Sequence, residues 1–116
     1  MPDSPIFAKL HDLLTWLLPR TLKFPREYRF SLALRIQTCA LDLQHALVAA
    51  VKLPTAHARA DALTQADITL AELRLLLRLA TDLKLLDSPG YGHTARLTEE
   101  VGRLLGAWKK KSDTAG

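Results

Sequence analysis

Apolar residues recur every three or four positions in four stretches of this chain, and prolines or a glycine-rich run separate the stretches. That spacing is the period of an α-helix with one face turned toward a core. No stretch alternates between apolar and polar residues as a half-buried strand does. Leucine and alanine dominate over β-branched and aromatic residues, which also favours helix. The chain therefore predicts an all-α fold, an antiparallel up-down four-helix bundle with short connections.

The breaks in the pattern place the helices within a single domain, 1–116, at about 5–22, 29–52, 56–86 and 94–111. Pro19 is expected to end or kink the first helix, and Pro25 to break the chain before the second. Pro54 ends the second helix. The sequence "DSPGYGH" at 87–93 is rich in turn residues and predicts a loop.

Two of the predicted helices carry more apolar surface than one core contact requires. The second has its main apolar stripe and also a separate one at heptad spacing, formed by Leu34, Leu41 and Val48. The later part of the third, "LAELRLLLRLATDLKLL", is apolar nearly all round. Because a helix that is apolar on several sides is buried on several sides, we predict that the protein is a homo-oligomer.

The fourth helix carries Gly102 and Gly106 beside its apolar face, followed by Trp108. A glycine inside a helix costs about 1 kcal/mol relative to alanine. We therefore expect both glycines to allow close approach of a neighbouring helix. Together with Trp108 they are predicted to serve packing or assembly.

Glu72 lies on the apolar side of the third helix, between Ile68 and Leu76. An unpaired buried carboxylate is strongly unfavourable. Two interpretations stay open. Either the bundle is open to water at this level, or Glu72 is paired with a charge at a helix or subunit contact.

The chain has a formal net charge of +4, which favours an anionic partner. Arg74 and Arg78 lie on one face of the third helix, as either a basic ridge for phosphates or a solvated polar strip. Further basic residues lie in the first connection and at the end of the fourth helix: Arg26, Arg29, Lys109, Lys110 and Lys111. No aromatic residues are expected to interleave with these charges. RNA or DNA is therefore predicted to bind by backbone charge alone, without sequence preference.

Residues suited to catalysis or metal binding are sparse. The single cysteine, Cys39, is predicted to be a small buried residue. Asp42 and His45 come closest to a metal-binding pair, but they lie on the polar side of the second helix. The other histidines fall in different segments and are expected at the surface: His11, His57 and His93. We therefore predict no enzymatic activity, metal or cofactor; a small metallo- or hydrolytic enzyme is the alternative of another class.

The sequence "MPDSPIFAKL" has no basic start followed by a long apolar core, as a secretory signal would. No run reaches the roughly 18 apolar residues that a membrane span requires. We therefore expect a cytoplasmic protein that does not contact a membrane.

Two segments resemble a known family. The third helix contains "LRLLLRLATDL", in which Leu73-Arg74 is followed, after two residues, by Leu77-Arg78. The fourth contains "EVGRLLGAW", with its two glycines and tryptophan. Both resemble the accessory variability determinant (Avd) proteins of diversity-generating retroelements. The segment "FPREYRFSLALRI" is also similar to the wider group of four-helix bundles that includes proteins encoded in ribosomal-RNA intervening sequences.

The Avd resemblance implies a homo-pentameric barrel with a basic surface and no known catalytic site. Such proteins bind the retroelement's reverse transcriptase and nucleic acid, and they support mutagenic cDNA synthesis and retrohoming. By this resemblance Arg74 and Arg78 serve the partner or the nucleic acid, whereas the glycines and tryptophan of the fourth helix are packing residues. Glu72 departs from the resemblance, which implies an apolar residue there. The alternative within the same fold group is an RNA-binding bundle related to the intervening-sequence proteins.

Overall fold

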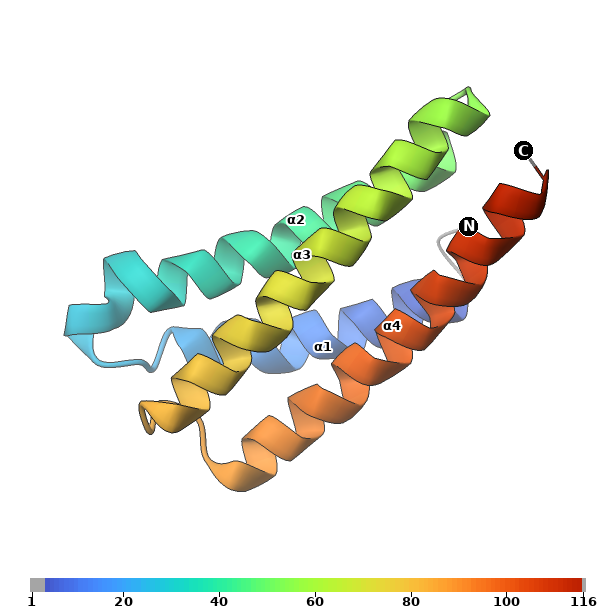
Figure 1. Ribbon diagram of the computed structural model, residues 1–116. Helices are drawn as coiled ribbons and strands as arrows, with labels where there is room; N and C mark the ends of the chain where they lie inside the picture. The colour runs from blue at the N-terminus through green and yellow to red at the C-terminus, as the bar shows by residue number, and fades with distance from the viewer. Residues whose placement is uncertain (1–3, 116) are drawn as a thin grey trace.

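The computed structural model describes residues 4–115, and all regular structure in this range is helical (Figure 1). Its long helices are α1 (Pro5–Thr21), α2 (Leu34–Lys52), α3 (Ala56–Asp82) and α4 (Ser88–Ala115). A 3₁₀ turn, η1 (Arg26–Tyr28), and a π-helical turn, η2 (Arg29–Ala33), precede α2. The prediction of an all-α protein with four compactly packed helices is confirmed. The single domain predicted over 1–116 includes positions 1–3 and 116, which lie outside the described residues.

The four helices alternate in direction and form an elongated body of 46 × 25 × 21 Å (Figure 1). Leucines at the predicted helical spacing fill its interior. Burying one leucine side chain stabilises the fold by about 1.5–3 kcal/mol, so these residues supply most of its stability. The largest fully buried side chains include Leu10, Leu13, Leu17, Ile36, Leu43, Leu47, Leu63, Leu73, Leu77, Val101 and Leu105. None of the described helices combines the length and the apolar character that crossing a bilayer requires.

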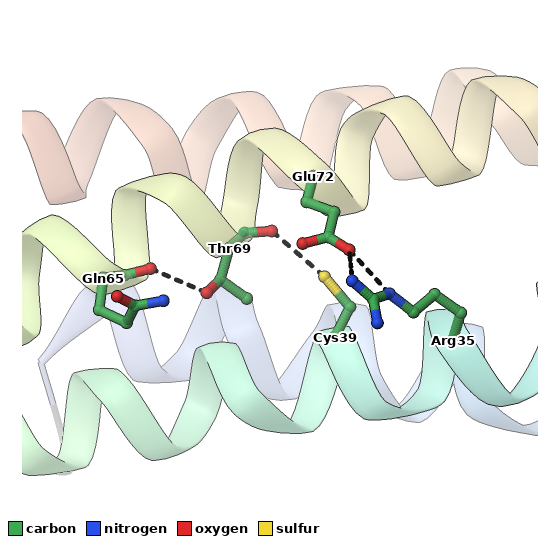
Figure 2. Close-up of polar contacts among 5 residues, drawn as sticks. All are labelled: Arg35, Cys39, Gln65, Thr69 and Glu72. Atoms are coloured by element: carbon green, nitrogen blue, oxygen red, sulfur yellow. Dashed lines mark hydrogen bonds and ion pairs between the residues drawn. The ribbon is translucent and has the colours of Figure 1, made fainter.

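Helices α2 and α3 lie along each other, and polar contacts join them at the middle of the bundle (Figure 2). Arg35 Nε donates a hydrogen bond to Glu72 Oε1 at 2.8 Å, and this bond is the main reason that the pKa of Arg35 is raised. The Glu72 side chain is 38% exposed. Glu72 is therefore both partly hydrated and paired across a helix contact, so each of the two interpretations is correct in part.

Cys39 is buried, as predicted, and its Sγ donates a hydrogen bond to the carbonyl oxygen of Thr69 at 3.3 Å (Figure 2). Burial raises the pKa of the thiol to about 11, and the carboxylates of Glu72 and Asp42 add to the shift. The thiol therefore stays protonated at neutral pH, where it is a weak nucleophile. Cys39 is a packing residue of the α2–α3 contact.

The connection between α3 and α4 differs from the prediction. The loop predicted at 87–93 is wrong, because α4 already begins at Ser88. The Asp87 side chain accepts a hydrogen bond from the Gly90 N–H at 2.7 Å and so caps the new helix. Before it, α3 ends at Asp82 instead of 86. Lys84 takes a left-handed conformation (φ 67°), and the Leu85 N–H donates to the Ala80 carbonyl at 2.8 Å, which closes the helix end.

Pro19 neither ends nor breaks α1, which continues to Thr21. The break comes at Pro25, as predicted, after a buried Phe24. Beyond this break, Gln37 Nε2 of α2 donates a hydrogen bond to Thr21 Oγ1 at 2.8 Å. This bond ties the end of α1 directly to α2.

Candidate nucleic-acid interface

Arg74 and Arg78 lie on the exposed side of α3, one helical turn apart. Helix α4 lies beside Arg74: a Cβ added to Gly102 of α4 would be 3.9 Å from Arg74 Nη1. Within residues 4–115, neither arginine forms an ion pair or a side-chain hydrogen bond. Both guanidinium groups are therefore exposed on one side of α3, which is compatible with either a basic ridge or a solvated strip.

A groove between α3 and α4 adds two arginines that the sequence analysis did not select, Arg96 and Arg103. Their position depends on how α4 is aligned with α3. Lys109 Nζ lies 3.1 Å from Asp67 Oδ2, and Gly102 faces Leu70, so Arg96 falls farther along, toward the end of α3. Periodicity could have placed Arg96 at the edge of the apolar face of α4, but only tertiary packing reveals its neighbours.

Carboxylates balance the arginines that line this groove. Arg74, Arg96 and Arg103 are accompanied by Asp67, Glu99 and Glu100. Arg103 donates to Glu100 Oε1 at 2.5 Å, and this hydrogen bond lowers the pKa of the carboxyl. Asp67 is likewise paired with Lys109. Of the three arginines that line the groove, Arg74 and Arg96 therefore have no internal partner in the described chain, and neither has Arg78 of α3.

The other predicted basic residues lie at the two ends of the bundle. Lys109 is the Asp67 partner described above, whereas Lys110 and Lys111 are exposed on the last turns of α4. Arg26 and Arg29 are exposed in η1 and η2, at the opposite end. The structure therefore does not bring all predicted basic residues into one continuous ridge.

The expectation that no aromatic side chain accompanies the basic residues is wrong. Phe30 directly follows Arg29 and is exposed, and the Arg29 guanidinium carbon lies 6.0 Å from the centroid of its ring. The alternation was visible in "REYRF", but only the structure distinguishes the exposed Phe30 from the half-buried Tyr28.

Gly102 and Gly106 do not mark a forced close approach within the described chain. A Cβ at Gly106 would meet no atom within 4 Å, and one at Gly102 would make an ordinary contact with Leu70 Cδ2 at 3.4 Å. Trp108 is half-buried and packs against the core. The glycine that permits a close approach is Gly90, where a Cβ would lie 3.1 Å from Trp16 Cη2.

Among the described residues, two apolar stripes remain on the surface of the single chain. The α2 stripe consists of Leu34, Leu41 and Val48, and each residue is 41–48% exposed. The α3 stripe consists of Ile68, Leu75, Leu79 and Leu83. Val48 also borders a groove between α1 and α2, whereas the α3 stripe flanks Glu72 beside α2. The two stripes therefore lie on different faces of the bundle.

The residues considered for metal binding do not converge. Among the described residues no group of three or more His, Cys, Asp or Glu side chains is arranged to hold a metal ion. Asp42 and His45 are exposed. His57 Nε2 lies 3.5 Å from Asp61 Oδ2. His93, expected at the surface, is half-buried, and its ring centroid lies 5.1 Å from that of Trp16.

Comparison with known proteins assigns this arrangement to a family. A comparison with curated proteins gives no match. Residues 6–112, nearly the whole chain, match the family described as bAvd-like. Proteins of the Avd family are generally non-catalytic accessory proteins. The chain therefore belongs to the bAvd-like family, the bacterial Avd accessory proteins of diversity-generating retroelements.

Proposed function

We propose that this protein is a non-catalytic accessory subunit that binds the reverse transcriptase of its retroelement together with nucleic acid. In that role it supports mutagenic cDNA synthesis and retrohoming. Family membership suggests the retroelement role and favours it over that of an intervening-sequence protein. The observation that carries nucleic-acid binding is the set of arginines without an internal partner on one side of the described bundle, Arg74, Arg78 and Arg96.

Binding at this surface is by charge. Guanidinium groups donate several hydrogen bonds to phosphate oxygens and release counterions from a nucleic acid. Arg74 and Arg78 are spaced by one helical turn, about 6 Å along the axis, so both can contact the same nucleic-acid backbone. The remaining charges of the α3–α4 groove are paired internally, except for Glu99, so the arginines set the sign of the local field.

The protein is further proposed to act as a homo-pentamer. The α2 stripe and the α3 stripe leave large apolar side chains in water, a state that association relieves. Because the stripes lie on different faces, the α2 stripe of one subunit can meet the α3 stripe of its neighbour. Contacts of this head-to-tail kind generate closed rings. The number five rests on the family resemblance.

The test is a double substitution, Arg74→Ala with Arg78→Ala, assayed for binding to single-stranded RNA across a series of salt concentrations. We expect weaker binding, with the slope of log K against log salt reduced by about 0.7 for each lost phosphate contact. The fold is expected to survive, because both side chains are exposed and unpaired in the described chain. Co-purification with the reverse transcriptase of the same retroelement then tests the second partner.

The control is Lys52→Gln with Lys84→Gln, which removes two exposed positive charges that do not line the α3–α4 groove. It is expected to change binding much less than the arginine pair does. Equal losses in the two double variants would mean that only net charge matters. Unchanged binding of the arginine variant at every salt concentration would reduce Arg74 and Arg78 to a solvated strip.

A further inference from the structure

Phe30 is the most exposed of the large apolar side chains in the described residues, with 83% of its surface accessible. The hydrophobic effect opposes this exposure in the isolated chain. Its neighbours in sequence are cationic: Lys23, Arg26 and Arg29 are all exposed, and the segment from 22 to 31 contains one acidic residue, Glu27. Solvation of the three cations does not explain why the Phe30 ring is exposed to water beside them.

The backbone holds Phe30 in this position. The turn η2 (Arg29–Ala33) is π-helical, and its last two residues, Leu32 and Ala33, are buried in the core. The residues before them, including Phe30, face outward. Single π-helical turns are rare and are frequent at functional sites. Since Leu32 and Ala33 anchor the turn, the ring is presented on a fixed support and not on a loose loop.

The charges around the ring indicate what kind of partner it meets. The centre of a subunit contact is depleted of charged residues, whereas a site for single-stranded nucleic acid combines cations with an aromatic platform. The Arg29 guanidinium, 6.0 Å from the ring centroid, lies near enough to contribute to such a stack. Phe30 is four residues before Leu34 of the α2 stripe, so a subunit contact is the competing explanation that a test must separate.

We propose that Phe30 stacks on an unpaired base of single-stranded nucleic acid, while Lys23, Arg26 and Arg29 hold the adjoining phosphates. The inference rests on the proposed function in that it requires nucleic acid to bind this protein. It adds a second contact, remote from Arg74 along the chain, and a preference for unpaired bases that backbone charge does not provide. Because every base has a π-face, the site accepts different sequences.

The experiment compares three fluorescent probes of equal length: a single-stranded oligonucleotide, an abasic single strand with the same phosphates, and a duplex. The wild-type protein is expected to bind the single strand more tightly than the abasic strand. Phe30→Leu keeps an apolar side chain but removes the ring, so it is expected to weaken single-strand binding by at least about fivefold. Its binding to the abasic strand is expected to stay unchanged, and Phe30→Trp is expected to restore single-strand binding.

The matched control is Leu22→Ala, which shortens another exposed apolar side chain of the same segment and should leave all three affinities unchanged. Wild-type affinity of Phe30→Leu for the single strand, or an equal loss on the abasic strand, would overturn the stacking site. A reduced native mass of Phe30→Leu would assign the ring to a subunit contact instead and would also overturn it. If the wild-type protein binds none of the probes, nucleic-acid binding as proposed above fails as well. If only the Phe30 effect is missing, that proposal stands.

Discussion

At the scale of single residues, two glycines of α4 have opposite surroundings. The methyl group of an alanine at position 90 would lie 2.9 Å from Asp87 Oδ1 and 3.1 Å from Trp16 Cη2. Asp87 could move only by giving up its hydrogen bond to the Gly90 N–H. Trp16 is held between the Arg20 guanidinium, 3.9 Å from its ring centroid, and the His93 ring. At position 106 the same methyl group meets no atom within 4 Å.

We therefore predict that the two alanine substitutions change stability in opposite directions. Gly90→Ala is expected to lower the free energy of unfolding by about 1–3 kcal/mol, the usual cost of overpacking. Gly106→Ala is expected to raise it by up to about 1 kcal/mol, because alanine is the better helix former. Urea denaturation of the two variants beside the wild type measures both changes. A destabilised Gly106→Ala protein would contradict the prediction and indicate that another subunit covers this position.

At the scale of elements, the informative feature is the start of α4. The sequence "DSPG" contains turn formers, and the same residue types also begin helices. What decides between the two is the Asp87 side chain, which accepts the Gly90 N–H, together with the Asp87 carbonyl, which accepts the Tyr91 N–H at 2.9 Å. The helix gains about one and a half turns before the predicted start, and Gly90 packs on Trp16 of α1.

Asp87→Ala removes this cap, and we expect the free energy of unfolding to fall by about 0.5–2 kcal/mol. Asp87→Asn retains a side-chain oxygen that can accept the same hydrogen bond, so its stability should stay close to that of the wild type. Thermal unfolding followed by circular dichroism compares the two variants. Equal melting temperatures for Asp87→Ala and the wild type would show that tertiary packing alone fixes the start of α4.

Helix interiors were predictable here because burial imposes one period on the leucines of each segment. The ends were less predictable. Lys84 takes a left-handed backbone conformation that glycine or asparagine usually fills, so no local signal marks the end of α3. The candidate site likewise has a part that the sequence predicts and a part that only the tertiary structure shows. Arg74 and Arg78 share a face by their spacing alone, whereas the contribution of Arg96 depends on the alignment of α4 against α3, which is a tertiary property.

At the scale of the whole molecule, the two apolar stripes of the described chain lie on different faces. On α2, exposed polar residues such as Asp42 and His45 separate the α2 stripe from the side that contacts α3. On α3, the stripe lies beside Glu72, which is bound to Arg35. A dimer with a two-fold axis would use one patch twice and leave the other in water. The proposed ring would instead join the α2 stripe of one subunit to the α3 stripe of the next, and would so cover both.

This arrangement predicts a specific result for single and mixed variants. Leu41→Glu places a charge in the α2 stripe, and Leu75→Glu places one in the α3 stripe; both side chains are exposed, so the fold should tolerate the change. In a head-to-tail ring every contact needs one stripe of each kind, so each variant alone should be monomeric by native mass spectrometry. An equimolar mixture should form dimers, because the intact α3 stripe of one variant can meet the intact α2 stripe of the other. Ala107→Glu, an exposed change on α4, should keep the wild-type mass. If each variant alone instead forms dimers, the two stripes pair with themselves, and a closed ring of identical contacts is excluded.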